Sequence, residues 1–290
     1  MARIADLLMA GKTFSFEFFP PKNDAEQATL VRTLRELEPL DPSFVSVTYR
    51  GGASSRQRTH DLVAGMLRTT TLTPMAHLTC VVHSRVELAE ILVNFRKAGL
   101  ENVLALGGDP PPDDEAGAGE LKHASELVEL ARAIGGFSIG VAAHPELHPN
   151  SGGDRLADRD HLAAKMELAD FAITQFFFRV SDYTALVEDL AERGMDKPVV
   201  PGIMPITNLK SVRRMAQLSG CDVPPETVAR LESVAGDDDA VWRMGVDLAT
   251  ELCRQLLDAG APGLHFYTLN RSTATREIYE NLGLGLAKPH

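Results

Sequence analysis

The segment TFSFEFFPP, Thr13–Pro21, has the alternating pattern of a buried β-strand that carries one carboxylate in its middle. With a period of two, Phe14, Phe16 and Phe18 share one face, and Glu17 lies on the opposite face. A carboxylate among aromatic side chains loses hydration, so burial favours its protonated form unless a cation or hydrogen-bond donors meet it. This environment suits a general acid. The alternative is that Glu17 pairs with a basic residue and has only a structural role.

Outward from this segment, short β-rich runs alternate with longer helical patterns, which is typical of βα units. The expected strands are Thr13–Pro20, Phe44–Arg50, Met75–Val81, Asn102–Asp109, Phe137–Pro145, Phe171–Phe178, Val199–Pro205 and Gly263–Leu269. Eight such units predict an α/β fold, a (β/α)8 TIM barrel, as a single domain over residues 1–290. The rival is a doubly wound sheet, but no Gly-x-Gly-x-x-Gly turn follows the first strand.

Composition limits the classes of partner. The formal net charge of −11 argues against general binding of nucleic acid or of anionic membranes. Cys80, Cys221 and Cys253 are far apart and in no metal-binding spacing, which favours reduced thiols. We find no signal peptide and no apolar run that could span a bilayer. The sequence therefore predicts a soluble, cytoplasmic protein with small-molecule partners, and it leaves the oligomeric state open.

Polar residues recur at the carboxyl ends of the expected strands. If every strand follows the phase of the first, seven polar side chains point inward: Glu17, Thr48, His77, Asp109, His144, Gln175 and Tyr267. Packing inside a barrel calls for Val, Ile and Leu at such positions, so a converging polar set predicts a site at the catalytic face. A slip of one residue in any strand would turn its side chain outward.

Single features of this set allow several interpretations. His144 and His148 suggest a metal pair, but Pro145 interrupts them and no cysteine or carboxylate completes the site. The glycine-rich turn after Arg50 suits an anion at a helix N-terminus. Gln175 lies among apolar residues, and a flat heterocycle with paired donors and acceptors would satisfy its amide.

Eight motifs in register resemble the methylenetetrahydrofolate reductase family along almost the whole chain. They are SFEFFPPK around Glu17, VSVTY at Val45–Tyr49, HLTC at His77–Cys80, GGDPP at Gly107–Pro111, VAAHPELHP at Val141–Pro149, ITQFFF at Ile173–Phe178, PGIMP at Pro201–Pro205 and HFYTLNR at His265–Arg271. The resemblance implies a (β/α)8 barrel that reduces 5,10-methylenetetrahydrofolate to 5-methyltetrahydrofolate with NADH or NADPH, normally by way of FAD.

The resemblance also implies roles for single residues. Glu17 matches the general acid that opens the five-membered ring of the substrate, and Asp109 matches the carboxylate that holds the pterin beside the redox centre. Gln175 matches a folate contact, and Arg271 matches a residue that meets the glutamate tail. Tyr267, which shares the inward face, joins the expected substrate-binding set. The positions that match flavin contacts are Thr48, His77, His148 and Lys165.

Four departures from the family pattern fall on the flavin-binding positions. Gly107 replaces the arginine of an Arg-Gly-Asp run, and Arg50 replaces a glycine. His123 and His144 replace tyrosines. We therefore expect FAD binding to be weakened or lost, with NAD(P)H lying at Arg50, Gly107 and His144 and passing hydride directly.

Two further hypotheses remain open from the sequence. One is a metal-dependent barrel hydrolase that uses His77, His144 and Asp109, and it predicts bound zinc. The other is a non-catalytic folate-binding relative, which predicts tight folate binding without turnover. The presence of Glu17 favours an enzyme over this second alternative.

Overall fold

The computed structural model describes residues 2–49, 53–108 and 119–284, and its strands close into one parallel barrel. The strands are β1 Thr13–Phe18, β2 Phe44–Val47, β3 Pro74–Thr79, β4 Asn102–Leu106, β5 Ser138–Ala143, β6 Phe171–Phe176, β7 Val199–Ile203 and β8 Gly263–Tyr267. They follow chain order around the barrel, and β8 closes it by pairing with β1. The expected TIM barrel is confirmed.

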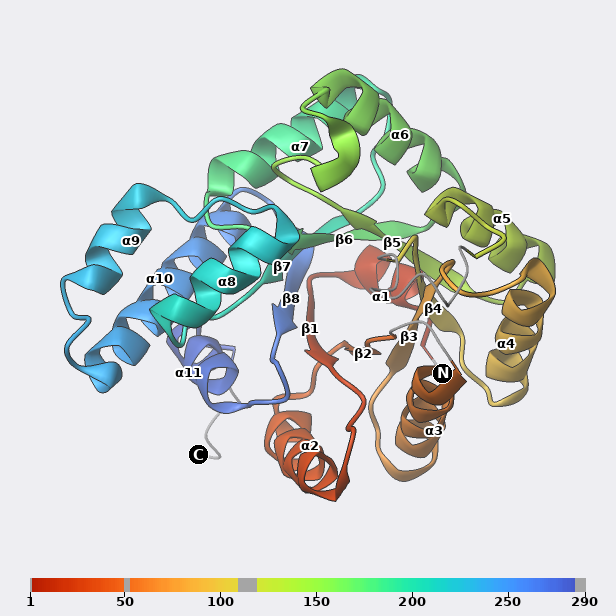
Figure 1. Cartoon of the computed structure of the whole chain (residues 1–290), viewed down its shortest axis with the longest axis horizontal. Helices are drawn as coiled ribbons and strands as arrows, with labels where there is room; N and C mark the ends of the chain where they lie inside the picture. The colour runs from red at the N-terminus through yellow and green to blue at the C-terminus, as the bar shows by residue number, and fades with distance from the viewer. Residues whose placement is uncertain (1, 50–52, 109–118, 285–290) are drawn as a thin grey trace.

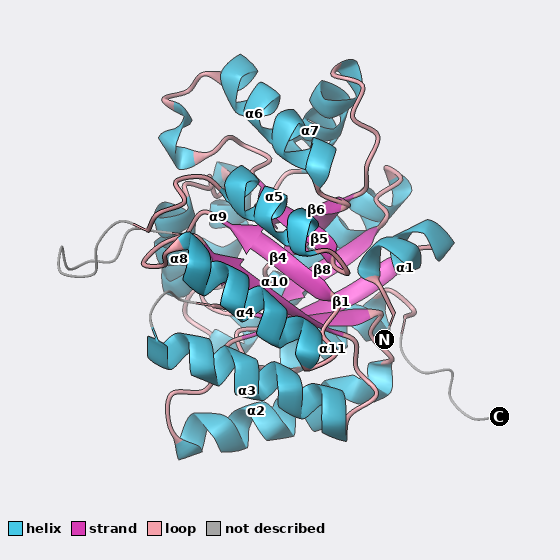
Figure 2. Cartoon of the chain, turned by 90° about the vertical axis from the view of Figure 1, so that its right-hand side faces the viewer, coloured by secondary structure: helices cyan, strands magenta, loops and turns pink. Residues whose placement is uncertain are grey.

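All described helices except α1 surround the strands on the outside of the barrel (Figures 1 and 2). The helices of the described residues are α1 Ile4–Ala10, α2 Asp24–Leu37, α3 Ala53–Thr69, α4 Arg85–Lys97, α5 Ala124–Ile134, α6 Arg155–Leu168, α7 Val180–Glu192, α8 Leu209–Ser219, α9 Pro225–Glu232, α10 Asp238–Asp258 and α11 Thr273–Asn281. The sequence pattern at Pro224–Val234 predicts an extra short helix before the last crossover, and this helix is α9. Within the described ranges, no helix has the length and apolarity needed to cross a membrane.

Short polar side chains fix where several of these helices begin. Asn23, Asp154 and Asn208 each accept a hydrogen bond from a backbone N–H in the first turn of α2, α6 and α8. Ser84 forms a reciprocal capping box with Glu87 at the start of α4. Each cap satisfies backbone donors that the helix leaves unpaired, so the sequence sets these boundaries locally.

Helix α1 was not among the expected elements, and it closes the amino-terminal end of the barrel (Figure 1). Ile4 and Leu8 pack on side chains inside the barrel, among them Phe44 and Phe171. Its first turn is held by Asn102, whose Oδ1 accepts the Ile4 N–H at 2.9 Å. Because α1 and an apolar layer fill this end, polar chemistry inside the barrel is confined to the carboxyl end of the strands.

Candidate active site

Glu17 lies near the carboxyl end of β1, and its carboxyl group meets three polar side chains from other strands. The Glu17 Oε2 atom is 3.5 Å from Nε2 of His77, 3.5 Å from Nε2 of His265 and 3.5 Å from Oγ of Ser46. Glu17 is 6% exposed, so the group is almost entirely buried. Among the described residues, every polar contact of this carboxyl group is made by Oε2.

His77 is a neutral neighbour of this carboxyl group. Burial lowers the pKa of His77 from 6.5 to about 4, although the charge of Glu17 acts in the opposite direction. At neutral pH the imidazole is therefore uncharged, and the 3.5 Å contact is too long for a strong hydrogen bond. Because the imidazole is uncharged, we interpret this pair as a polar contact and not as a salt bridge.

The loop after β8 fixes the end of the strand that carries Glu17. Thr268 Oγ1 donates to the backbone oxygen of Glu17 at 2.6 Å. The amide of Asn270 both accepts from the Phe19 N–H at 2.8 Å and donates to the Phe19 oxygen at 2.9 Å. Leu269 and Asn270 have φ values of 51° and 57°, a left-handed conformation that is unusual for leucine. This strained turn places Asn270 where it can hold β1.

Tyr267, the last residue of β8, lies inside the barrel next to His265. Its hydroxyl donates to the Thr174 oxygen at 2.6 Å, and its ring lies edge-on to His265 with centroids 5.4 Å apart. Burial raises the pKa of Tyr267 well above its usual value, so it stays protonated. A Cβ at Gly202 would lie 2.6 Å from the Tyr267 ring, so this position of the ring requires glycine there.

Gln175 occupies an irregular part of β6. The register between β6 and β7 shifts between Ile173 and Phe176. Gln175 is half-buried between two buried neighbours, and its Oε1 accepts the Phe176 N–H at 3.0 Å. The structure therefore confirms that this amide is set into an apolar strand.

A second polar group lies at the carboxyl end of β5, against α6. The rings of His144 and His148 meet edge to face with centroids 4.7 Å apart. Burial, with smaller contributions from the charges of His148, Lys165 and Arg159, lowers the pKa of His144 to about 3. Lys165 donates to the Ala142 oxygen at 2.6 Å, and burial lowers its pKa to about 8. At neutral pH this group therefore contains an uncharged His144 beside Lys165, whose ammonium loses its proton more readily than that of an ordinary lysine.

The remaining predicted site residues lie around the mouth of the barrel or outside the described part. Thr48 follows β2, and its N–H donates to the Phe18 oxygen at 2.9 Å. Gly107 follows β4, and Arg271 is exposed in the loop after β8. Arg50 and Asp109 lie outside the described residues.

No group of three His, Cys, Asp or Glu side chains within residues 2–49, 53–108 and 119–284 is arranged to hold a metal ion. His77 contacts Glu17, whereas His144 contacts His148 in the second group. The two histidines of the hydrolase hypothesis thus belong to different clusters.

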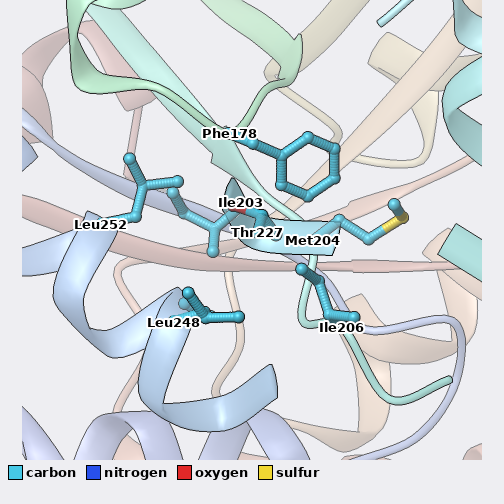
Figure 3. A pocket seen from close by; sticks show the side chains of 8 residues that line it. Phe178, Ile203, Met204, Ile206, Thr227, Leu248 and Leu252 are labelled. Atoms are coloured by element: carbon cyan, nitrogen blue, oxygen red, sulfur yellow. The ribbon is translucent and has the colours of Figure 1, made fainter. Parts of the chain in front are cut away.

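An apolar pocket lies outside the barrel, between β7 and helices α9 and α10 (Figure 3). Its lining is formed by Phe178, Ile203, Met204, Ile206, Thr227, Leu248, Ala249 and Leu252. None of the polar residues around Glu17 or His144 lines it. The pocket is therefore separate from the candidate site.

The family is shown by sequence comparison. Residues 3–283 match the family model described as methylenetetrahydrofolate reductase. The 5,10-methylenetetrahydrofolate reductase of Escherichia coli K12 is 36% identical over 273 residues, which cover 93% of this chain and 90% of that protein. The chain belongs to the methylenetetrahydrofolate reductase family.

A plant relative agrees with this family assignment, and a solved structure agrees with the fold. Methylenetetrahydrofolate reductase (NADH) 1 of Arabidopsis thaliana is 35% identical over 297 residues, and the chain spans about half of that longer protein, 50% of its length. A Clostridium thermocellum protein described as binding two copies of 5-methyl-5,6,7,8-tetrahydrofolic acid superposes with a TM-score of 0.68, covering 97% of this chain and 96% of its own. At 13% identity, that second similarity supports the fold alone.

Sequence reasoning did not single out three side chains of the polar cluster around Glu17, namely Ser15, Ser46 and His265. Ser15 shares the face of Glu17 on β1, Ser46 precedes Thr48 by two residues, and His265 precedes Tyr267 by two. The period-2 phase that predicted Thr48 and Tyr267 also points these three residues inward. All three lie within the quoted motifs, but they are one step deeper along their strands than the motif residues to which the resemblance assigns a role.

Proposed function

We propose that this chain reduces 5,10-methylenetetrahydrofolate to 5-methyltetrahydrofolate, with NADH or NADPH as the hydride donor and residues 1–290 as one catalytic barrel domain. The family assignment supports the reaction class. The observation that carries the proposal is Glu17, a carboxyl group buried at the carboxyl end of the strands beside an imidazole that is uncharged at neutral pH. No described cation lies against it, which suits a group that must donate a proton.

In this proposal Glu17 donates its proton to N10 of the substrate. The bond between N10 and the methylene carbon then breaks and leaves an iminium cation between N5 and that carbon. The nicotinamide transfers hydride to the methylene carbon, which becomes the methyl group. NAD(P)H supplies the hydride, Glu17 supplies the proton, and solvent restores the proton to Glu17, so the reaction balances as methylenetetrahydrofolate, NAD(P)H and a proton giving methyltetrahydrofolate and NAD(P)+.

The other residues of the mouth would bind and orient the folate. Asp109 and Gln175 are proposed to hydrogen-bond the pterin, and Arg271 to meet the glutamate tail. Tyr267 is proposed to support the ring from the inner side, because its hydroxyl is already fixed by the Thr174 oxygen. Holding both reactants at contact distance would supply much of the rate enhancement.

We further propose that the hydride passes directly, without flavin. The described residues at the positions that match flavin contacts support this part of the proposal. A Cβ at Gly107 would meet no described atom within 4 Å, and glycine supplies no cation at the position of the family's arginine. His144 is neutral, and the Lys165 ammonium already donates to the Ala142 oxygen. Thr48, Arg50, His77, His144, His148 and Lys165 would instead bind the nicotinamide dinucleotide.

The test of the proposed function is Glu17→Gln, which keeps the shape of the side chain and removes its acidic proton. Turnover of methylenetetrahydrofolate with NADH should fall by roughly two to four orders of magnitude. Nicotinamide binding, measured by fluorescence titration, should survive. Asp170→Asn is a matched control, since that carboxylate binds Arg132 at the opposite end of the barrel and should affect stability but not kcat.

Near wild-type turnover in Glu17→Gln would return Glu17 to a structural role. A wild-type protein that binds folate tightly but oxidises no NADH or NADPH would instead support the non-catalytic relative.

A further inference from the structure

The ring of His265 is completely buried inside the barrel and is fixed by packing and by hydrogen bonds. It is 0% exposed, with Phe44 stacked on one face at a centroid distance of 6.0 Å and an interplanar angle of 13°. Tyr267 meets it edge-on. Nδ1 lies 2.8 Å from Ser15 Oγ, and Nε2 lies 3.4 Å from Ser46 Oγ and 3.5 Å from Glu17 Oε2. A histidine clamped by packing and by one hydrogen bond leaves its other nitrogen in a fixed place.

The two ends of the ring have different partners, and these decide which nitrogen carries the proton. Ser15 Oγ is 2.8 Å from Nδ1 but 3.4 Å from the Leu264 oxygen. The shorter contact favours donation from the Ser15 hydroxyl to Nδ1, which makes Nδ1 the acceptor. In the ring with a single N–H, the proton is then on Nε2, the nitrogen that faces Glu17 and Ser46.

With this tautomer, the contacts of Glu17 are asymmetric. Oε2 faces the N–H of His265, and the hydroxyl of Ser46 lies 3.5 Å from the same oxygen. These donors favour a carbonyl-like Oε2 and leave the acidic proton on Oε1. When Oε1 loses its proton to the substrate, negative charge develops on Oε2, where the donors already point.

We propose that His265 is a positioning residue for Glu17: fixed by Ser15 through Nδ1, it orients Oε2 through Nε2, together with Ser46, so that Oε1 presents the proton to the substrate. This inference rests on the proposed function, and it deepens that function by adding a residue that acts only through the general acid. Because the His265 ring is 0% exposed, it would act on folate only through Glu17.

A pair of substitutions separates the two ends of the ring. His265→Gln keeps an N–H near the position of Nε2, and His265→Asn keeps a polar group near Nδ1 but cannot reach Glu17. We expect His265→Asn to lower kcat by roughly 10- to 100-fold with little change in KM for the folate, because the acid is present but misplaced. His265→Gln should recover most of that loss. Equal kcat values in both variants and the wild type would overturn the proposal.

A double variant tests whether His265 acts through Glu17. If it does, Glu17→Gln/His265→Asn should have the kcat of Glu17→Gln alone within about threefold, because the effects of residues that act as a unit are not additive. A full multiplicative loss in the double variant would show an independent structural effect and would overturn the proposal. Ser138→Ala is the control for a buried polar side chain at the far end of the barrel, where Ser138 Oγ accepts from the Ala5 N–H, and its kcat should not change.

A readout independent of activity keeps this inference separate from the proposed function. In nitrogen-15 NMR of the wild-type protein, the His265 ring, assigned by the signal that disappears in His265→Gln, should carry its proton on Nε2. A proton on Nδ1 would refute the positioning proposal even in a fully active enzyme. A wild-type protein with the expected tautomer but no turnover would refute the reductase instead.

Discussion

In the proposed mechanism Glu17 must keep its proton, and a charged His77 beside it would favour the loss of that proton. The pH dependence of unfolding tests whether His77 is charged. Burial lowers the pKa of His77 from 6.5 to about 4, and the residue is 6% exposed. In the unfolded chain His77 takes up a proton near its ordinary pKa, whereas the folded protein resists protonation down to about pH 4. Between these values the unfolded state binds more protons, so the free energy of unfolding falls as the pH falls.

The size of the effect follows from the same two values. A lowering of the pKa from 6.5 to about 4 corresponds to about 3 kcal/mol of stability, present above pH 6.5 and fully lost below pH 4. We expect urea unfolding, followed by circular dichroism from pH 7.5 to 4.5, to show the wild type losing about 2 to 3 kcal/mol more than His77→Gln. His144 is present in both proteins, so its own titration cancels in the difference.

The opposite result has a clear meaning. If His77 were charged and paired with an ionised Glu17 at neutral pH, its folded pKa would lie above 6.5, and the wild type would gain stability relative to His77→Gln as the pH fell toward 6.5. That outcome would refute the conclusion that His77 is uncharged at neutral pH. It would also leave Glu17 without the proton that the mechanism needs.

Three further predictions concern the mouth of the barrel. Asp109→Ala and Gln175→Ala should each weaken folate binding by about 1 to 3 kcal/mol in calorimetry while nicotinamide affinity changes less, and normal folate affinity in both would mean that neither side chain faces the pterin. Gly202→Ala should destabilise the protein by about 1 to 3 kcal/mol in urea unfolding, because the added Cβ would lie 2.3 Å from the Thr174 oxygen and 2.6 Å from the Tyr267 ring, and an unchanged midpoint would contradict that placement. Gly107→Arg should restore a cation in open space and raise the fraction of protein purified with FAD, read from the absorbance spectrum, whereas a variant as free of flavin as the wild type would show that Gly107 is not the cause.

Much of the fold follows from local sequence pattern. The first strand was predicted at Thr13–Pro20 and is observed at Thr13–Phe18, because the apolar alternation that defines it ends at the two prolines. Helix α1 was not predicted, since seven residues that are almost all apolar span only about two turns and show no clear periodicity of their own. Its stability comes from tertiary packing of Ile4 and Leu8 and from the side chains of Asn102 and Ser138, which accept hydrogen bonds from its backbone and which no local pattern reveals.

The candidate site was predictable only in part. Alternation from Glu17 placed His77 and Tyr267 on the inward face, and the structure brings His77 into contact with Glu17 and Tyr267 into the same interior. Pattern could not show that His144 joins His148 and Lys165 in a separate group, because that depends on how the loop after β5 folds against α6. It also missed His265, whose role depends on a hydrogen bond to Ser15 across 250 positions of sequence.

In the proposed reaction, hydride passes directly from the nicotinamide to the folate, and Glu17 supplies the proton. The most direct measurement uses NADH with both hydrogens at C4 of the nicotinamide replaced by deuterium, together with methylenetetrahydrofolate and protein shown by its spectrum to be free of flavin. We predict one deuterium per methyl group of the product, by mass spectrometry, at a rate unchanged by added FAD. A product that carries hydrogen from solvent, as expected when an exchangeable flavin N–H intervenes, or turnover that appears only after FAD is added, would contradict the account.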